Sequence, residues 1–483
     1  MKLRELLKGV DVIKASVNLD TEITDVTYDS RKVTPGCLFL AIVGFVTDGN
    51  RYISGALEKG AAAVVTAVEP EGDIPYVLVS SDRLAMALIG ANFYGEPTKD
   101  MHLIGITGTN GKTSSTLLLK HILETTVGAK VGLIGTMEIL IGDRAIPAER
   151  TTPESLDLQK LFAQMRDAGC SHVIMEVSSH AIALERIGGM HFTVAAFTNL
   201  TEDHLDFHKT MEHYCDTKAE LFARTDKAVA NCDDSWFARV TAKATTPVFT
   251  TSMKPGAGMW AEQQELLSDG IRFRAVTAEE AAEVYLPIPG KFTVYNAMTA
   301  IGCALQLGIS LQAAAEALKT AKGIKGRVEV VPTPGKDYTI LIDYAHTPDG
   351  LENVLSSVRG FCKGRLIAVF GCGGDRDPIK RPIMGKIGVE LADIAIITSD
   401  NPRTEDPAAI IRDILQGVSA DYNNYEVIEN RITSIHRAMD IAQKNDIIVL
   451  AGKGHETYQE ICGVKYDLDE RVVVAEYLKK TDA

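Results

Sequence analysis

Residues 102–124, HLIGITGTNGKTSSTLLLKHILE, constrain the fold more strongly than any other stretch of the chain. An apolar run leads into a glycine-rich turn and a Lys-Thr pair, and a helical pattern follows at once. This order of strand, turn and helix is the context that a phosphate-binding loop requires. Strands that alternate with helices also predict an α/β fold with a parallel sheet.

The glycine-rich turn predicts a nucleotide site. Backbone N–H groups would wrap the phosphates, and the dipole of the following helix would add to the attraction. The residues of this loop are Gly108, Thr109, Asn110, Gly111, Lys112 and Thr113. Lys112 would reach the outer phosphates, and the Thr113 hydroxyl would bind Mg²⁺. The strict motif has glycine where this chain has Ile106, so a turn without a ligand is the alternative.

The remaining apolar runs divide the chain into three domains, since 483 residues are too many for one core. We expect an N-terminal domain over residues 1–98, a central P-loop ATPase domain with a parallel sheet over 99–331, which GRVEVV closes, and a smaller Rossmann-like C-terminal domain over 332–483. Strands are expected at HVIMEVS, VAAFTNL, YTILIDYA, RLIAVFGCGG, DIAIITSD and DIIVLAGKG.

The composition of the chain excludes several classes of protein. The formal net charge of −14 argues against a general nucleic-acid binder but leaves room for a nucleotide site. The eight cysteines include no C-x-x-C pair, which argues against a disulfide framework or a structural zinc site. The first residues, MKLRELLKGVDVIKASV, predict no signal peptide, and no window approaches a membrane span. We therefore expect a soluble cytoplasmic protein.

Acidic and histidine side chains follow two further strands. Glu176 ends HVIMEVS, and TNLTEDHLDFH carries Asp203 and His204. Because ligands gather at the carboxyl ends of parallel strands, Glu176 and His204 could lie beside the phosphate loop and hold Mg²⁺. The alternative is that these side chains cap loops and form salt bridges. Lys218 in HYCDTKAELF would repel Mg²⁺ as an ammonium, and a helix-surface position is the ordinary expectation for it.

The stretch ITSDNPRTEDP, residues 397–407, concentrates polar groups after an apolar run. A ligand that is both an amine and an acid would need such a set, because Arg403 offers a planar fork for a carboxylate and Asn401 can donate and accept. Pro402 stiffens the loop. The alternative is a helix start, with Asp400 or Asn401 as the cap and Pro402 at the first helical position. We expect that this turn starts a helix and that its side chains also face the ligand.

These stretches occur with others in an order typical of one family. The motifs are GITGTNGKT, TTPESL, MEVSSHA, NLTEDHLDFH, YCDTKAELF, GKFTVYNAM, GRVEVV, DYAHTPD, GCGGDRD, SDNPRTEDP and AGKGHE. They cover nearly the whole chain, which resembles the Mur ligases. The resemblance implies a first domain that holds a uridine nucleotide, a second that is the ATPase, and a third that brings the incoming amino acid.

The resemblance also implies roles for single residues. Contacts to a UDP-N-acetylmuramoyl dipeptide are implied for Ser30, Thr151, Thr152, Ser178 and Arg186, while Leu184 stands where many relatives carry glutamine. Contacts to ATP are implied for Asn296, Arg327, Asp343 and His346. Lys218 matches a lysine that CO₂ carbamylates to N6-carboxylysine, so it would join Thr113, Glu176 and His204 around the metal. The implied catalytic residues are Lys112, Glu176, His204 and Lys218.

In this family DNPR resembles the signature of enzymes that take meso-2,6-diaminopimelate rather than lysine. The implied pocket consists of Arg376, Asp400, Asn401, Pro402, Arg403, Gly452 and Glu456. Glu456 would pair with the distal ammonium, and Arg403 would grip the carboxylate that lysine lacks. Lysine would leave Arg403 without a partner, at a cost of roughly 10⁴-fold or more in specificity.

The implied activity is an ATP- and Mg²⁺-dependent ligation of diaminopimelate to the D-glutamyl γ-carboxylate of UDP-N-acetylmuramoyl-L-alanyl-D-glutamate, through an acyl phosphate. The product would serve cell-wall synthesis, and with it cell shape and division. His180 is a candidate base for the amine. The partners would be small molecules, with no nucleic acid or membrane, and we expect a monomer. The alternatives are a folylpolyglutamate synthase, a lysine-adding Mur ligase, and a P-loop switch that hydrolyses ATP without ligation.

Overall fold

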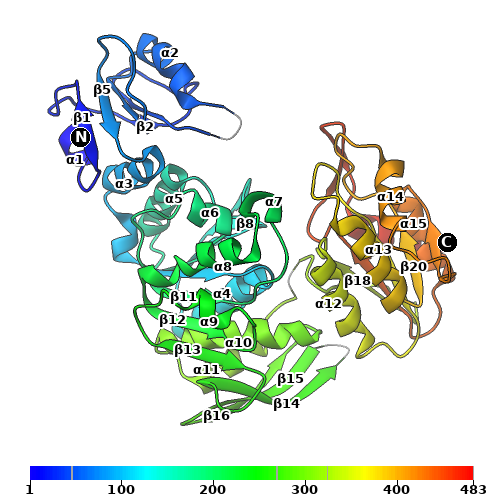
Figure 1. Ribbon diagram of the computed structural model, residues 1–483. Helices are drawn as coiled ribbons and strands as arrows, with labels where there is room; N and C mark the ends of the chain where they lie inside the picture. Colours follow the sequence, from blue (N-terminus) through cyan, green and yellow to red (C-terminus); the bar gives the residue numbers. More distant parts are fainter. Residues whose placement is uncertain (45–46, 268–269, 324, 482–483) are drawn as a thin grey trace.

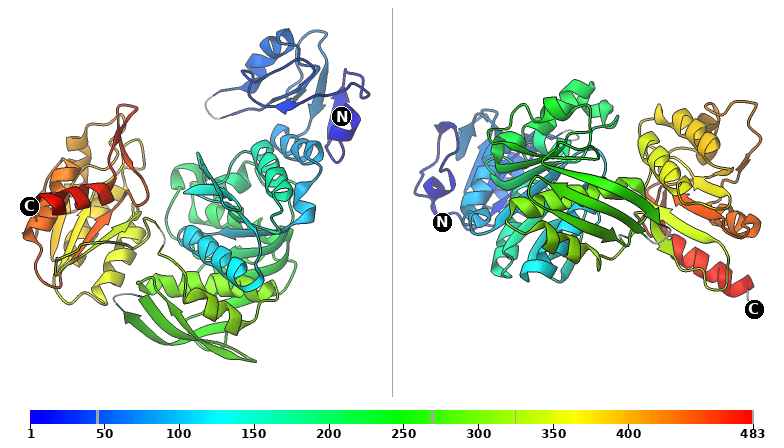
Figure 2. Two further views of the ribbon diagram at one scale, coloured as in Figure 1. Left: turned by 180° about the vertical axis from the view of Figure 1, so that it is seen from behind. Right: turned by 90° about the horizontal axis from the view of Figure 1, so that it is seen from below.

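The computed structural model describes residues 1–44, 47–267, 270–323 and 325–481. Figure 1 shows three α/β domains in chain order: N-terminal (blue), central (cyan to green) and C-terminal (yellow to red). The views in Figure 2 agree that the central domain lies between the other two. The three-domain α/β architecture expected from the sequence is confirmed. Within those ranges, no helix has the length and hydrophobicity that crossing a bilayer requires.

The N-terminal domain is built on a sheet with the order β1-β5-β4-β3-β2, in which β1 is antiparallel and the other strands are parallel. Its elements are α1 (Leu3–Leu6), β1 (Val12–Ala15), β2 (Val26–Thr27), β3 (Leu38–Ala41), η1 (Gly49–Tyr52), α2 (Ile53–Glu58), β4 (Ala63–Thr66), β5 (Tyr76–Val79) and α3 (Asp82–Phe93). Helix α3 packs against α5 (Ser155–Asp167) of the central domain. Leu156 of α5 joins the N-terminal core, so this helix pair ties the two domains together.

The central sheet has the order β16-β15-β14-β13-β12-β11-β6-β10-β7-β8-β9. Its strands are β6 (His102–Thr107), β7 (Val131–Ile134), β8 (Glu138–Ile141), β9 (Arg144–Pro147), β10 (His172–Glu176), β11 (Phe192–Phe197), β12 (Thr225–Asn231), β13 (Val248–Ser252), β14 (Met259–Leu267), β15 (Gly270–Thr277) and β16 (Ala281–Leu286). The adjacent strands in the middle of this order are parallel, as expected: β14, β13, β12, β11, β6, β10 and β7. Antiparallel edges, β8–β9 and β15–β16, were not predicted from the sequence.

The helices of the central domain cover both faces of this sheet (Figure 1). They are η2 (Pro97–Asp100), α4 (Lys112–Val127), α5 (Ser155–Asp167), α6 (Ser179–Ala183), α7 (Leu205–His208), α8 (Met211–Ala219), η3 (Phe222–Arg224), α9 (Phe237–Val240), α10 (Lys291–Gln306) and α11 (Leu311–Leu318). Ile104 and Ile106 of β6 pack on the face that α4 and α10 cover, and Leu103 packs on the other face. Because both faces of β6 are apolar, it lies in the interior of the sheet, and the loop after it lies at the centre of the domain.

The C-terminal sheet has the order β17-β18-β22-β19-β20-β21, with β17 antiparallel and the other strands parallel. Its domain contains β17 (Glu329–Val331), β18 (Thr339–Asp343), α12 (Pro348–Arg359), β19 (Leu366–Phe370), α13 (Lys380–Leu391), β20 (Ile394–Ile397), α14 (Pro407–Leu415), β21 (Tyr425–Val427), α15 (Arg431–Ile441), β22 (Ile447–Ala451), β23 (Tyr458–Ile461), β24 (Val464–Asp467) and α16 (Glu470–Thr481). GRVEVV was expected to close the central domain, yet its strand β17 pairs with β18. The numerical domain bounds stay predictions.

The DNPR turn does not begin a helix, contrary to the expectation from the sequence. Helix α14 starts at Pro407, and its cap is Asp406, whose side chain accepts a hydrogen bond from Ala408 N at 3.1 Å. Asp400 and Asn401 are buried in the loop after β20. The Asp-Pro pair that caps and starts α14 occurs later, at 406–407.

Replacing Asp406 with alanine is expected to destabilise the C-terminal domain by about 1 kcal/mol, because a first-turn amide of α14 loses its acceptor. Denaturant unfolding followed by circular dichroism measures the change. Glu476→Ala removes an exposed carboxylate from α16 without touching a cap, and this control should change stability by less than about 0.5 kcal/mol. Equal effects of the two substitutions would contradict the capping role.

Candidate active site

The phosphate loop lies where three parallel strands end together. Strand β6 pairs with β10 in a register that sets Glu176 beside Ile106, and with β11 in a register that sets Phe197 beside Thr107. Glu176 therefore flanks the loop on one side, and the segment after β11 flanks it on the other. This is the edge at which the sequence predicted these groups to gather.

Two glycines let neighbouring side chains approach the loop closely. A Cβ at Gly108 would lie 1.9 Å from Thr198 Oγ1. A Cβ at Gly111 would lie 2.3 Å from Asn296 Oδ1. Both glycines also have positive φ, 145° and 83° respectively, which other residues rarely adopt. Asn296, which the resemblance assigns to ATP, is thus brought directly against the loop.

The backbone amides of the loop divide into two sets. Thr109 N donates to Asn199 O at 2.8 Å, and Asn110 N donates to Asn199 Oδ1 at 2.9 Å. These two amides hold the shape of the loop, so the expectation that all six loop amides wrap phosphate is too broad. Helix α4 begins at Lys112, and among the described side chains none caps it. Its first-turn amides are the ones left for an anion.

Lys112 and Thr113 start helix α4 and bond to groups around the phosphate loop. Lys112 Nζ donates to Gly108 O at 2.9 Å, and burial lowers the pKa of this lysine. Thr113 Oγ1 donates to Glu176 Oε1 at 2.9 Å. The buried Glu176 carboxylate also accepts from Thr136 N and Oγ1. A hydroxyl and a carboxylate beside a phosphate loop are oxygen donors that suit Mg²⁺.

Lys218 is not on a helix surface. Its side chain on α8 is 1% exposed, and Nζ donates to Gly108 O at 3.0 Å. The same Nζ lies 4.5 Å from the centre of the Tyr214 ring. Burial, together with the nearby Lys112 ammonium, lowers the pKa of Lys218 well below its usual range. A buried amine of low basicity therefore lies beside the phosphate loop.

His204 lies at the same edge of the sheet but is more open. Its side chain is 46% exposed, and its ring centre lies 4.8 Å from that of His180 and 6.3 Å from that of Tyr214. Among the described residues, no group of three or more His, Cys, Asp or Glu side chains is assembled for a metal. Mg²⁺ needs only one or two protein carboxylates when phosphates and water complete its shell, and Thr113 with Glu176 fits that requirement.

The C-terminal domain touches the phosphate loop through an acid that was not predicted from the sequence. Asn110 Nδ2 donates to Asp349 Oδ2 at 2.5 Å, and Thr201 Oγ1 donates to the same oxygen at 3.3 Å. Asp349 belongs to the first turn of α12, in the motif DYAHTPD. Nothing in the spacing of that motif indicated a contact across two domains.

The other residues assigned to ATP lie in the same domain as this acid. Asp343 ends β18 and accepts hydrogen bonds from two backbone amides, both at 2.8 Å. Arg327 stacks on Tyr344, 4.9 Å from the ring centre. Its charge adds to the lowering of the Lys112 pKa by burial. His346 Nδ1 bonds to Tyr344 O at 2.8 Å.

Three residues assigned to the muramoyl dipeptide form one cluster in the central domain. Thr152 Oγ1 donates to Ser178 Oγ at 3.3 Å, and Arg186 Nη1 donates to Thr152 O at 2.9 Å. Thr151 Oγ1 lies 3.1 Å from Thr136 Oγ1, which in turn donates to the carboxylate beside the phosphate loop. The cluster is therefore connected to the candidate metal ligands.

Glu154 connects this cluster to the N-terminal domain. Its carboxylate pairs with Arg186 at 2.7 Å and with Arg83 of α3 at 3.5 Å. Glu154 belongs to the motif TTPESL, but the sequence did not predict its function, because its partners come from distant parts of the chain. These ion pairs restrict the orientation of the Arg186 guanidinium.

Ser30 belongs to the N-terminal domain and not to the cluster around Thr152. It lies in the loop after β2, where its carbonyl accepts a hydrogen bond from Lys59 Nζ at 2.8 Å. The same loop is tied to the central domain by Tyr28, whose hydroxyl donates to Asp157 at 2.6 Å. The assigned contacts therefore come from two domains joined by this hydrogen bond.

A cluster of buried polar side chains forms where the loop after β20 meets AGKGHE, and we call it the DNPR pocket because the resemblance assigns the amine substrate to it. Asn401 Nδ2 donates to Glu456 Oε2 at 2.8 Å. Lys453 is fully buried and donates to Asn401 Oδ1 at 3.0 Å and to Glu456 Oε2 at 3.2 Å, and it lies 3.7 Å from Asp400 Oδ1. Lys453 was not predicted as a site residue, although it belongs to the motif AGKGHE. Glu456 therefore has an ammonium partner before any ligand binds.

Gly452 allows the two loops of this pocket to meet. A Cβ at this position would lie 2.3 Å from Asp400 Oδ2. Behind it, Arg431 donates to Ala451 O at 2.8 Å and pairs with Glu470 at 2.8 Å. Both members of this ion pair are buried, so the floor of the pocket is fixed by charge as well as by packing.

Arg403 has partners of its own, which corrects the expectation that lysine would leave it unpaired. Its Nη1 donates to Gly374 O at 2.7 Å, and its Nε lies 3.6 Å from Glu460 Oε2. Its backbone, with a φ of 51°, also bonds to the β23–β24 hairpin. The Arg403 guanidinium therefore has these partners when no ligand carboxylate is bound. Arg376 is exposed and donates to the Asp375 carbonyl, and the described contacts do not bring it into the pocket.

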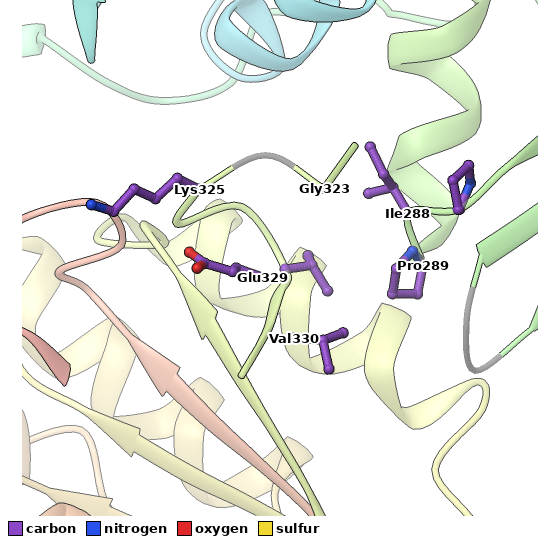
Figure 3. Close-up of a pocket in the computed structure, with 8 residues that line it drawn as sticks. Ile288, Pro289, Gly323, Lys325, Glu329 and Val330 are labelled. Atoms are coloured by element: carbon purple, nitrogen blue, oxygen red, sulfur yellow. The ribbon is translucent and has the colours of Figure 1, made fainter. Parts of the chain in front are cut away.

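A separate cavity lies between the central and C-terminal domains. Figure 3 shows Ile288 and Pro289 from the turn before α10 facing Lys325, which precedes β17, and Glu329 and Val330 of β17. Its volume is about 480 Å³. Of the described lining residues, none is an assigned site residue, so this cavity marks the junction of the two domains rather than the active site.

A phosphate loop in the central domain and a buried cluster of charged and polar groups in the C-terminal domain define a multidomain P-loop protein. Three family models match the chain: "Mur ligase family, catalytic domain" over residues 22–87, "Mur ligase middle domain" over 106–304 and "Mur ligase, glutamate ligase domain" over 326–454. The chain belongs to the Mur ligase family, a family of ATP-dependent ligases, as the sequence motifs predicted.

Full-length relatives agree with this assignment. The UDP-N-acetylmuramoyl-L-alanyl-D-glutamate--2,6-diaminopimelate ligase of Clostridium botulinum is 47% identical over 99% of this chain and 100% of its own length. The protein of the same name from Caldanaerobacter subterraneus subsp. tengcongensis is 48% identical over 100% of both chains. A solved structure of that name superimposes with a TM-score of 0.72 at 30% identity, covering 100% of this chain and 99% of the other.

Proposed function

We propose that this protein joins meso-2,6-diaminopimelate to the D-glutamyl γ-carboxylate of UDP-N-acetylmuramoyl-L-alanyl-D-glutamate, with ATP as the energy source. The observation that carries the proposal is the pocket at the DNPR loop. Arg403 offers N–H donors to a carboxylate, and the Glu456 carboxylate, which Asn401 Nδ2 holds in place, offers oxygen to an ammonium. Diaminopimelate carries both groups at its far end. The names of the relatives at 47% and 48% identity support the same substrates.

The first step in this proposal is phosphoryl transfer at the loop after β6. An oxygen of the D-glutamyl γ-carboxylate attacks the γ-phosphorus of ATP while the bond to the ADP oxygen breaks, which gives an acyl phosphate. Lys112 and the first amides of α4 stabilise the phosphate charge as it moves. Bound Mg²⁺ would supply further charge neutralisation, held by Thr113, Glu176, His204 and the modified Lys218.

Lys218 is assigned as the modified residue. The ammonium first loses a proton to water. The neutral amine then attacks the carbon of CO₂: an N–C bond forms, one C–O π bond opens to give the carboxylate, and a second proton leaves to water, so that over both losses a cation becomes a carbamate anion. Two features of the surroundings support this change. Burial disfavours the charged ammonium of Lys218, and the positive charge of Lys112 disfavours it further while favouring an anion. The carbamate also removes the repulsion that an ammonium would exert on Mg²⁺.

The second step joins the amine to the acyl carbon. The unprotonated amine of diaminopimelate attacks, a tetrahedral intermediate forms, and the C–O bond to phosphate breaks as the amide forms and the amine loses a proton. His180 is the candidate acceptor for that proton. Burial lowers its pKa, so its imidazole is neutral at pH 7 and able to accept.

The nucleotide substrate would lie across the first two domains. Thr151, Thr152, Ser178 and Arg186 would hold the muramoyl dipeptide, and Ser30 would meet the uridine-diphosphate sugar. Tyr28 and Asp157 hold the Ser30 loop against the central domain. The protein would work as a monomer on small molecules in the cytoplasm, where the precursors and ATP are available.

The test is phosphate release from the purified protein with ATP, Mg²⁺ and the muramoyl dipeptide nucleotide. Meso-diaminopimelate, L-lysine and no amino acid are compared. Release that depends on diaminopimelate is the expected result, because the amine is needed to turn over the acyl phosphate. Equal rates with lysine would keep the ligase but refute the role of Arg403. Release that needs no amino acid would refute ligation and favour an ATP-hydrolysing switch.

A further inference from the structure

A carboxylate of the protein already stands where the far carboxylate of the amine substrate is expected. Glu460 Oε2 lies 3.6 Å from Arg403 Nε. The side chains are 27% and 21% exposed respectively, so a ligand can reach the pair from solvent. Glu460 lies on β23, outside every motif that the sequence assigned to the pocket.

We propose that Glu460 is a specificity-determining residue: it occupies Arg403 in the empty pocket and competes with the far carboxylate of the amine substrate. The inference rests on the proposed function, in which Arg403 binds that carboxylate. It goes further by placing a competing group inside the protein.

The backbone positions Arg403 without help from the Glu460 carboxylate. Arg403 N donates to Glu460 O at 3.0 Å, and Cys462 N donates to Arg403 O at 2.6 Å. On the opposite side, Gly374 O accepts from Arg403 Nη1 at 2.7 Å. Because these bonds use main-chain atoms and a different nitrogen of the guanidinium, neutralising Glu460 leaves Arg403 where it is.

Asp400 and Glu456 share one buried ammonium, that of Lys453, at 3.7 and 3.2 Å. Lys465 lies opposite Glu460 in the register of the β23–β24 hairpin, but the ion pair that Glu460 forms is with Arg403. A substrate carboxylate on Arg403 would therefore lie close to the Glu460 carboxylate, and two like charges at such a distance repel each other. Lysine brings no second carboxylate and leaves the Arg403–Glu460 pair intact. Glu460 thus weakens the binding of diaminopimelate and reduces the preference for it over lysine.

The test is Glu460→Gln, which keeps the size of the side chain and removes its charge. The KM for diaminopimelate is expected to fall about three- to tenfold, with kcat and the kinetics with lysine unchanged. Asp467→Asn is the matched control, because it removes the same charge from an exposed position on the same hairpin. It should change the KM by less than about twofold.

Two results would overturn the inference about Glu460. An unchanged or higher KM in Glu460→Gln would overturn the inference and make Glu460 neutral or a support for Arg403. An equal fall in Asp467→Asn would overturn it in favour of general electrostatic attraction. Misfolding cannot imitate the expected result, since that result is tighter binding. If the unaltered protein releases no phosphate in response to diaminopimelate, the proposed function has failed, which is distinguishable from a failure of the Glu460 inference.

Discussion

Replacing Lys218 with methionine is expected to lower kcat for phosphate release about 10²- to 10³-fold, the range found when one electrostatic group is removed from a reaction centre. The Lys218 side chain is buried against Gly108 O and the Tyr214 ring, so a carbamate there would face the phosphate loop directly. Methionine is a similarly long, unbranched side chain and fills the space, but it cannot react with CO₂. Binding of the muramoyl nucleotide should change little, because its assigned contacts lie elsewhere.

Two measurements separate a carbamate from a purely structural lysine. With ¹³C-labelled bicarbonate, the unaltered protein should give a carbamate carbon signal that Lys218→Met lacks. Lys243→Met is the matched control, because Lys243 is a solvent-exposed lysine of the same domain that pairs with Glu220. It should keep both the signal and the activity. Full activity in Lys218→Met, or an unchanged signal, would contradict the assignment of this lysine.

Replacing Arg403 with alanine is expected to lower kcat/KM for diaminopimelate about 10²- to 10³-fold, because charge-assisted hydrogen bonds to one carboxylate are lost. The kinetics with lysine should change by less than about threefold, since lysine has no carboxylate at that end. The loss is smaller than an unpaired arginine would produce, because Glu460 and Gly374 already engage the guanidinium. Steady-state phosphate release with each amino acid measures both numbers.

The loss of kcat/KM in Arg403→Ala must be specific to diaminopimelate. Arg437→Ala removes an arginine that pairs with Glu426 on the surface of the same domain, and it should leave the ratio between diaminopimelate and lysine unchanged. A parallel loss with lysine in Arg403→Ala would show that the residue supports the fold of the pocket rather than a carboxylate contact. Glu460→Gln and Arg403→Ala are expected to move the KM for diaminopimelate in opposite directions.

Local features of the chain were predictable from the sequence. The order of apolar run, GTNGKT and helical pattern predicted β6, the phosphate loop and α4, because strand periodicity, glycine conformation and helix starts depend on neighbouring residues. Glu176 was predicted to lie beside the loop, because the end of a parallel strand determines which edge its last residue reaches. The predicted C-terminal strands are also present, since each is an apolar run buried on both faces.

Contacts between distant segments were decided only by the tertiary structure. The burial of Lys218 depends on β6 and α8 meeting, and the hydrogen bond between Asn110 and Asp349 depends on how two domains sit against each other. Glu460 reaches Arg403 because a hairpin folds back over the DNPR loop. The physical reason is the same in each case. Periodicity and turn chemistry act over a few residues, whereas the charge that a side chain meets in the folded protein comes from whichever segment packs beside it.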